Sequence, residues 1–204
     1  MTEKEKMLSG KLYTALDKEL GRELLNARRI TRLFNNTLEG EFEVRQKLLN
    51  DLFEKTGENI YIEPPFRCDY GCHISVGDRF YANFDCIFLD VNKITIGNNV
   101  FLGPRVSIFT ACHPIDASVR NTLLEYGKPV SIGNGVWIGG NTVINPGVTI
   151  GNNVIIGSGS VVTKNIPDNV IAAGNPCKVL RAITKEDQEY WEDKQREYHQ
   201  QKNG

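Results

Sequence analysis

The side chains best suited to proton transfer near neutral pH are three histidines, His73, His113 and His199. His199 lies in a polar C-terminal stretch. His73 directly precedes Ile74, which the repeat described below directs inward, so we expect His73 to lie at the surface. His113 lies in the irregular segment TACHPID, before a proline that restricts its backbone. His113 is therefore the candidate general base of this chain.

The cysteines could indicate a metal site or a disulfide framework. There are five of them, Cys68, Cys72, Cys86, Cys112 and Cys177. Their odd number and the lack of a CxxC pair favour a reducing cytosol. Cys72-His73 and Cys112-His113 could offer four ligands, but sequence-adjacent residues fit one tetrahedral ion poorly, so we predict no metal site. We expect Cys68 and Cys86 to fill the core as small apolar side chains.

The segment that precedes His113 and the one that follows its loop share a six-residue period. It is regular from Pro129 to Lys164, where each hexad begins with a small or aliphatic residue and has an apolar residue two positions later. The first set is Val130, Val136, Thr142, Val148, Val154 and Ser160, and the second is Ile132, Ile138, Ile144, Ile150, Ile156 and Val162. Because strand side chains alternate, both positions point inward. The period predicts a mainly β fold, a parallel β-helix with one short strand and one corner per hexad.

Less regular hexads begin at Asn59. Their inward positions are Ile62, Cys68, Ile74, Phe80 and Cys86, with Tyr70, Val76, Ala82 and Phe88 two residues later. The register slips by two residues at 90–93, restarts at Ile94 and continues to Thr110. Residues 111–128 have no hexad register and predict a loop that leaves the coil. An insertion of this kind in a solenoid is usually functional.

The two ends of the chain read as helical. We expect one helix with Leu8, Leu12, Leu16 and Leu20 at i+4 spacing, a second with Leu24, Ala27, Ile30 and Phe34, and a third with Val44, Leu48 and Leu52. A polar helix follows Thr184. The predicted organisation is a helical segment over 1–57, the β-helix over 58–183 with the catalytic loop at 111–128, and a helix and tail over 184–204.

Composition excludes several classes of partner. Lys and Arg number 24 against 25 Asp and Glu, so the net charge of −1 gives no reason to expect nucleic acid or an anionic membrane. No apolar run reaches the length of a membrane span. The N-terminal residues lack the apolar core of a secretion signal, and we expect a cytoplasmic protein.

Four further segments carry a family resemblance. FYANFDCIFLDV (80–91), TACHPID, NPGVTIG (145–151) and AAGNPCKV (172–179) resemble the maltose and galactoside O-acetyltransferases, which are hexapeptide-repeat acyltransferases. RCDYG (67–71), ANFDC and HPID are similar to the maltose branch. The resemblance implies a left-handed β-helix, against the usual right-handed crossover rule. It also implies a homotrimer with active sites in the clefts between subunits, and acetyl-CoA as co-substrate.

The resemblance also implies roles for individual residues. His113 would take the proton of a sugar hydroxyl during its attack on the acetyl thioester and pass it to the departing thiolate. Asn83, in YANF, would hold the reacting hydroxyl or the oxyanion. The backbone at Gly139 and Gly140, beside Trp137, would follow the pantetheine arm and donate an N–H to the thioester carbonyl. Packing of Trp137 against a neighbouring subunit is compatible with that role.

Further binding residues are implied in the same way. Ser158, Thr163 and Lys164 match cofactor contacts, and Lys178 and Arg181 match basic residues for the phosphates of CoA. Asp69 and Asp90 match the wall of the sugar pocket. Ala15 stands where the galactoside branch has an N-terminal acid, so Asp17, two residues on, is the acid we expect to face the acceptor. Cys112 stands where the family pattern has Thr or Gly.

The sequence leaves two other functions open. A relative of this family could acetylate a different hydroxyl compound, such as serine, an antibiotic or a cell-envelope sugar. A non-catalytic trimeric β-helix scaffold would explain the hexads but gives no reason for TACHPID or for Lys178 and Arg181. We therefore predict an acetyl-CoA-dependent O-acetyltransferase that acts on a maltose- or glucose-like sugar.

Overall fold

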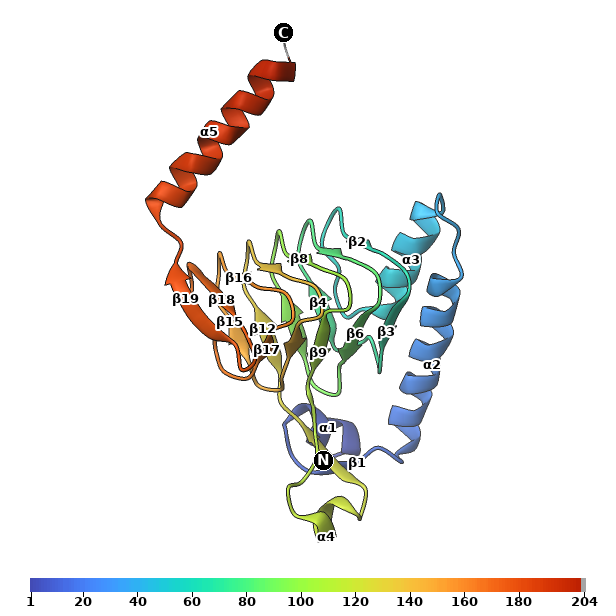
Figure 1. The fold of residues 1–204 in the computed structure, drawn as a ribbon. Coiled ribbons are helices and arrows are strands. Elements are labelled where there is room, and N and C mark those ends of the chain that lie inside the picture. Colours follow the sequence, from blue (N-terminus) through green and yellow to red (C-terminus); the bar gives the residue numbers. More distant parts are fainter. Residues whose placement is uncertain (203–204) are drawn as a thin grey trace.

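The chain coils into a left-handed parallel β-helix in a computed structural model that describes residues 1–202 (Figure 1). Its short strands stack into three flat sheets that form the three faces of a prism. The first face contains β2 (Tyr61–Ile62), β5 (Tyr81–Ala82), β8 (Phe101–Leu102), β13 (Trp137–Ile138), β16 (Ile155–Ile156) and β18 (Val170–Ala173). The second face contains β3 (Phe66–Cys68), β6 (Cys86–Leu89), β9 (Ser107–Phe109), β14 (Val143–Ile144) and β17 (Val161–Val162). The third contains β4 (Ile74–Val76), β7 (Ile94–Ile96), β12 (Val130–Ile132) and β15 (Thr149–Ile150).

The chain visits the three faces in this order on every turn. Strands of one face pair in parallel with the strands one turn away, as Trp137 pairs with Ile155 three hexads later. We call the edge between the first and second faces the first edge, the edge between the second and third faces the second edge, and the remaining one the third edge. Residues at corresponding positions of successive turns therefore stack along one edge.

The interior of the prism is filled by the predicted inward positions. Both hexad sets between Pro129 and Lys164 are buried, and so are the nine positions assigned between Ile62 and Phe88, Cys68 and Cys86 among them. Thr142 is a polar residue at an inward position. Its hydroxyl donates a hydrogen bond to the Gly139 carbonyl at 2.7 Å, which compensates for the loss of water on burial. The period alone located this core correctly.

Stacked amide side chains close the third edge. Asn98 Oδ1 accepts the N–H of Asp78, Asn134 Oδ1 accepts the N–H of Asn98, and Asn152 Oδ1 accepts the N–H of Asn134. Glycine precedes these residues because the stack leaves no space for a side chain: a Cβ on Gly77 would lie 2.2 Å from Asn98 Oδ1. The Gly-Asn corners are thus part of the repeat, where each amide side chain bonds to the backbone of the neighbouring turn.

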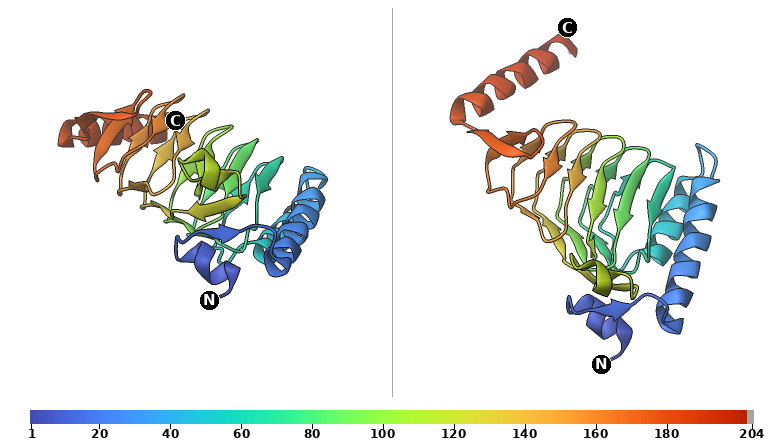
Figure 2. Two further views of the ribbon diagram at one scale, coloured as in Figure 1. Left: turned by 90° about the horizontal axis from the view of Figure 1, so that it is seen from below. Right: turned by 60° about the horizontal axis from the view of Figure 1, so that its bottom comes forward.

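The N-terminal segment forms three helices, α1 (Glu3–Leu8), α2 (Lys18–Asn35) and α3 (Phe42–Leu52), with the short β1 (Tyr13–Thr14) between the first two. Helices α2 and α3 lie against the first turn of the prism, at the end opposite β18 (Figures 1 and 2). Phe34 and Leu52 share a continuous core with Phe66 of β3. The helices therefore cap the open end of the solenoid and bury its first layer.

Two details of the helix prediction were wrong. The first helix ends at Leu8, because Gly10 adopts a left-handed conformation with φ of 74°. Leu12 and Leu16 are exposed, the latter at 79 %. In the third helix Val44 is exposed and Arg45 is buried, because Arg45 bonds to the preceding loop through the Thr37 hydroxyl. The spacing of apolar residues indicated neither the end of the first helix at Leu8 nor the burial of Arg45.

Residues 111–127 leave the coil at the second edge, as predicted, and fold into an arm. The arm consists of β10 (Ala111–Cys112), α4 (Ala117–Arg120) and β11 (Leu124–Gly127). β11 pairs with β10 on one side and with β1 on the other, both antiparallel. Asn92, in the register slip, donates to the carbonyls of Met7, Leu8 and Gly127. The slip therefore joins α1, the coil and the base of the arm.

The C-terminal end turns back on itself. β19 (Lys178–Ala182) pairs antiparallel with β18, and α5 (Lys185–Lys202) projects away from the prism (Figures 1 and 2). The predicted helix after Thr184 is present, while residues 203 and 204 of the predicted tail lie outside the described residues. None of the helices within residues 1–202 combines the length and apolar character that crossing a membrane requires.

Candidate active site

His113 lies at the base of the arm, at the second edge. It directly follows β10, and its side chain is exposed. The loop beyond it is fixed, because Arg120 Nη1 donates to the carbonyls of Pro114 at 2.9 Å and Ile115 at 3.0 Å. Asp116 caps α4 by accepting the N–H of Val119. The predicted base thus lies on a short and well-supported loop.

A carboxylate of the arm lies at the second edge beside the N-terminal segment. The ladder between β10 and β11 ends with Cys112 opposite Tyr126, directly before His113. Glu125, the neighbour of Tyr126, pairs with Tyr13 of β1, and the Tyr13 hydroxyl donates to Glu125 Oε2 at 3.0 Å. The arm that carries the candidate base is thus joined to the N-terminal segment through Glu125.

Asp69 is the second carboxylate of this edge. It follows β3, and Arg28 Nη2 of α2 lies 3.4 Å from Asp69 Oδ1. Burial first, and the nearby Asp90 charge second, raise the pKa of Asp69 to about 6. The side chain is partly exposed, so this carboxyl can meet a ligand.

Asp90 has a different role from the one expected. It is fully buried, Oδ1 accepts the N–H groups of Asp69 at 3.0 Å and Tyr70 at 2.9 Å, and Oδ2 lies 3.4 Å from the N–H of His73. Burial raises its pKa to about 6, against these hydrogen bonds, which lower it. Asp90 therefore positions the 69–73 segment and does not itself face the acceptor side in this chain.

The prediction that His73 lies at the surface was wrong. His73 is only 3 % exposed, and its ring Nδ1 is 2.7 Å from the Asp90 carbonyl oxygen. The alternation rule failed because the N-terminal helices cover this corner, with Glu23 of α2 lying beside Cys72. Burial lowers the pKa of His73, so the imidazole is neutral at pH 7.

Asp17 has a structural task. It is the N-cap of α2, where its Oδ1 accepts the N–H groups of Glu19 at 2.8 Å and Leu20 at 3.1 Å. The carboxylate is partly exposed, and a contact with an acceptor stays a prediction.

Asn83, Gly139, Gly140 and Ser158 stack along the first edge, at the ends of β5, β13 and β16. The Asn83 carbonyl group Oδ1 accepts the N–H of Phe84 at 2.8 Å, which directs the side-chain NH2 group away from its own backbone. The turns are in close contact, since a Cβ on Gly139 would lie 2.5 Å from Ser158 N. Beside this edge a hollow of about 400 Å³ is lined by Tyr81, Asn83, Phe101, Gly103 and Trp137, and Trp137 is 55 % exposed.

The remaining predicted cofactor residues lie further along the prism. Thr163 and Lys164 follow β17 and are exposed at the second edge, whereas Lys178 and Arg181 lie on β19. The Arg181 guanidinium forms a two-pronged ion pair with Asp187 of α5, at 2.6 and 2.9 Å. This pair holds the pKa of Asp187 well below its usual range. Arg181 is thus engaged at the start of α5.

The structure does not bring the two predicted catalytic residues together within one chain. Asn83 is at the first edge and His113 is at the second, with the whole width of the second face between them. A site that contains both side chains has to combine the first edge of one chain with the second edge of another.

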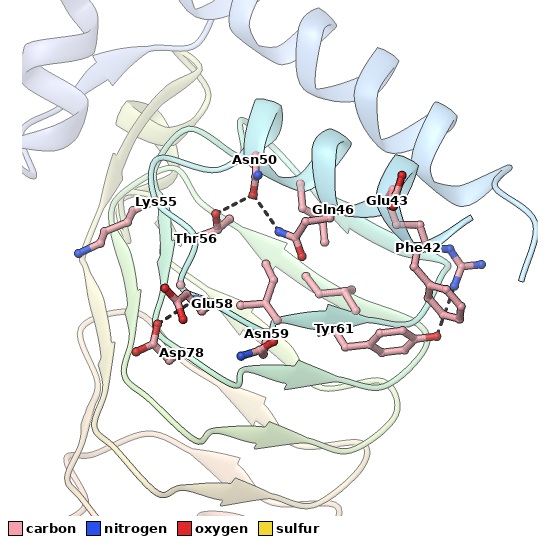
Figure 3. A pocket seen from close by; sticks show the side chains of 15 residues that line it. Phe42, Glu43, Gln46, Asn50, Lys55, Thr56, Glu58, Asn59, Tyr61 and Asp78 are labelled. Atoms are coloured by element: carbon pink, nitrogen blue, oxygen red, sulfur yellow. Dashed lines mark hydrogen bonds between the residues drawn. The ribbon is translucent and has the colours of Figure 1, made fainter. Parts of the chain in front are cut away.

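A larger hollow lies elsewhere. It has a volume of about 850 Å³ and lies between α3 and the first turn, and Figure 3 shows the lining side chains. Its polar groups satisfy one another: Gln46 and Thr56 both donate to Asn50 Oδ1, and Asp78 accepts the N–H of Glu58. None of the predicted catalytic, cofactor or acceptor residues lines it.

Comparisons with known proteins agree with this geometry. The maltose acetyltransferase hexapeptide capping motif matches residues 6–57, and the bacterial transferase hexapeptide model, with six repeats, matches residues 129–164. Galactoside O-acetyltransferase of Escherichia coli K12 is 42 % identical over 92 % of this chain and 92 % of its own length. The solved structure of a maltose O-acetyltransferase from Clostridium difficile 630 is 59 % identical, with a TM-score of 0.90 over 91 % of this chain and 99 % of that one.

The chain belongs to the maltose and galactoside O-acetyltransferase family of hexapeptide-repeat acyltransferases. A third relative, a hexapeptide-repeat acetyltransferase from Vibrio cholerae, was solved in complex with acetyl-CoA; it is 35 % identical, with a TM-score of 0.85 over 91 % of this chain and all of that one. Membership confirms the prediction of an acetyl-CoA-dependent O-acetyltransferase on a β-helix.

Several residues at the second edge of this acetyltransferase could not be predicted from the sequence. Arg28 contacts Asp69, and Tyr13 contacts Glu125, which lies near Asp69, but these residues come from separate segments of the chain. The signal for Glu125 was one acidic residue between apolar ones in LLEYG. The arm pairs with β1 and so joins these segments, but the hexad pattern does not predict this pairing.

Proposed function

We propose that this acetyltransferase moves the acetyl group of acetyl-CoA to a hydroxyl of a maltose- or glucose-like sugar, with His113 as general base. The observation that supports it most strongly is the group of Tyr13, Glu125 and Asp69 at the second edge, the edge from which the arm departs. Carboxylates accept hydrogen bonds from vicinal hydroxyls, and the exposed His113 follows β10 at the base of the same arm.

The reaction follows in one displacement through a tetrahedral intermediate. His113 removes the hydroxyl proton as the sugar oxygen forms a bond to the thioester carbon. The Asn83 side-chain NH2 and the backbone at Gly140 stabilise the oxyanion that develops on the carbonyl oxygen. The carbon–sulfur bond then breaks, and the proton held by His113 passes to the CoA thiolate.

The cofactor would lie along the first edge. Trp137 offers an exposed aromatic surface for the pantetheine arm, Ser158 lies one turn further, and Lys178 and Arg181 lie on β19 toward the C-terminal end. Thr163 and Lys164, at the second edge, would meet this cofactor from a neighbouring copy. Lysine and arginine side chains suit the phosphate groups of CoA.

The active form in this proposal is a homotrimer. The first edge carries Asn83 and the second edge carries His113, so each complete site is shared between two copies. Exposed apolar side chains fit such an assembly: Ile115, Val119 and Leu123 lie on the arm, and Phe84, Phe101 and Trp137 lie on the first face and first edge. An arm that reaches a neighbouring copy would cover both sets.

A thiol-release assay with acetyl-CoA and a panel of acceptors tests the proposal. We expect turnover with maltose and glucose to exceed that with galactosides, serine, aminoglycosides and envelope sugars. Preference for one of the other acceptors would replace the sugar assignment, and no turnover with the entire panel would contradict the function. All five cysteines are unpaired, which fits a reducing compartment, and we propose the cytosol as the location.

A further inference from the structure

Three side chains with metal-binding atoms converge under the N-terminal helices. They are Glu23 of α2 and Cys72 and His73 of the corner between β3 and β4. One ligand atom of each lies within 4.8 Å of the other two. Within residues 1–202 this is the one group of three or more His, Cys, Asp or Glu residues with such spacing.

His73 supplies an independent indication of a ligand. Its Nε2 is the one buried side-chain polar atom in residues 1–202 that has no hydrogen-bond partner. The other ring nitrogen, Nδ1, lies 2.7 Å from the carbonyl oxygen of Asp90. Because a carbonyl can only accept, Nδ1 carries the proton and Nε2 presents a lone pair. An orphaned lone pair on a residue that is 97 % buried requires an explanation.

The arrangement around His73 matches that of metal-bound histidines. Such histidines usually donate their second N–H to a carboxylate or a backbone carbonyl, which fixes the tautomer and the ring. Here the Asp90 carbonyl fills that role. Protein folding has therefore already oriented the free nitrogen.

Glu23 is oriented in a similar way. Its Oε1 pairs with Lys4 of α1, while Oε2 faces Cys72 Sγ at 3.8 Å. Ligand atoms around a tetrahedral zinc ion lie roughly 3.3–3.8 Å apart, as bond lengths near 2.0–2.3 Å require. The Glu23–Cys72 pair already has this separation. Lys4 could keep its ion pair with Glu23 Oε1 while Oε2 binds a metal.

We propose that Glu23, Cys72 and His73 bind one divalent metal ion of the zinc type. The ligands would be Glu23 Oε2, the Cys72 thiolate and His73 Nε2, with water in the fourth position. Thiolate and imidazole ligands select zinc over magnesium or calcium. On binding, the Cys72 thiol gives its proton to solvent and its sulfur forms the bond to the metal.

The site would act as a clip. It joins α2 to the corner that follows Asp69 and Tyr70, so the metal would stiffen the wall next to the arm without touching the reacting atoms. Adjacency in the sequence argues against Cys72-His73 as half of a four-ligand set with Cys112-His113. The fold supplies a different third ligand, Glu23, 49 residues away from Cys72. This inference does not depend on the proposed acceptor.

Cobalt titration of the full-length protein tests the site directly. After treatment with a chelator under anaerobic conditions, we expect Co²⁺ to bind with one equivalent per chain and to produce a thiolate-to-cobalt charge-transfer absorption in the near ultraviolet. One equivalent of Zn²⁺ should abolish it. The absorption should disappear in Cys72→Ser and need at least about tenfold more Co²⁺ in Glu23→Gln, because a ligand is lost.

Two variants serve as matched controls. Cys112→Ser removes the thiol of the other Cys-His pair, and His199→Asn removes an exposed histidine on α5; both should retain the absorption. If the wild-type protein gives no charge-transfer band with Co²⁺ up to about 1 mM, where binding would be weaker than about 4 kcal/mol, the site is refuted. A band that persists in a folded Cys72→Ser variant refutes it as well. Should Cys72→Ser fail to fold, protection of the wild-type Cys72 thiol from a thiol reagent by Zn²⁺ decides, and unchanged reactivity contradicts the site.

Discussion

Asp90 Oδ1 accepts the backbone N–H of Asp69 at 3.0 Å, so a fully buried carboxylate positions a partly exposed one. The same oxygen accepts the N–H of Tyr70. Two acids that look equivalent in the sequence thus have separate tasks: Asp90 shapes the corner, and Asp69 is the one able to meet an acceptor. The division follows from burial, because only the outer carboxylate can exchange its partners for a ligand.

We predict that Asp90→Asn destabilises the protein by about 1–3 kcal/mol, since the amide NH2 replaces an oxygen that faces the N–H of His73 and leaves buried donors unpaired. Urea unfolding measures this. Asp85→Asn is the matched control, because the Asp85 side chain is 45 % exposed and its contact with Arg105 is 3.8 Å. Equal stability of the two variants would contradict the positioning role of Asp90.

A pH dependence follows from Asp69. Its pKa is raised to about 6 in the folded state, so the folded protein holds this proton more tightly than the unfolded chain does. The stabilising effect of the proton is present at low pH and is lost as pH rises through 6. We predict that Asp69→Asn becomes more stable relative to the parent as pH rises from 4.5 to 7. The measurement is the difference between their free energies of unfolding across this range. A difference that stays constant over this range would contradict the raised pKa.

The close contact of turns at the first edge predicts a steric effect. Gly139→Ala should destabilise the protein by about 1–3 kcal/mol, because the new Cβ would lie 2.5 Å from Ser158 N and Oγ. Gly21→Ala on α2, where a Cβ meets nothing within 4 Å, should instead stabilise by about 1 kcal/mol. Thermal unfolding of both variants provides the comparison. A neutral Gly139→Ala would show that the turns can move apart.

The ion pair at the start of α5 makes the role of Arg181 testable. If Arg181 contacts a CoA phosphate, Arg181→Ala should weaken CoA binding about tenfold, and Asp187→Asn, which frees the guanidinium, should strengthen it severalfold. Calorimetric titration with CoA measures both. Unchanged affinity in Arg181→Ala would limit this residue to anchoring α5, and absence of CoA binding by the parent protein would favour the scaffold hypothesis.

The sequence predicted those features that depend on near neighbours in the chain. Val130, Ile132 and their repeats could be placed inside because alternation along a strand is a local property. The arm could be placed because the hexads stop at Thr110. His73 was misplaced because its burial depends on Glu23 and α2, which arrive from another part of the chain. The periodicity of one segment does not indicate which residues from another segment will bury it.

The candidate site shows the same limit. His113 was proposed from its residue type and its irregular loop, whereas Glu125 and Tyr13 come together only when β11 pairs with β1. The opposite error concerns Asp90, whose carboxylate looked available in the sequence and is enclosed by backbone N–H groups in the structure. A residue's type suggests its chemistry, whereas its access to a ligand is decided by the fold.

The central claim is that His113 of one subunit and Asn83 of the next form one acetyl-transfer site. Co-expression of His113→Ala and Asn83→Ala chains, each inactive alone, tests it most directly. Random assembly leaves both residues intact at about one site in four, since each of the two positions is wild type half the time, so the co-expressed preparation as a whole should recover about a quarter of the parent activity. Mixtures that stay as inactive as either variant alone, although the chains assemble together, would contradict a shared site.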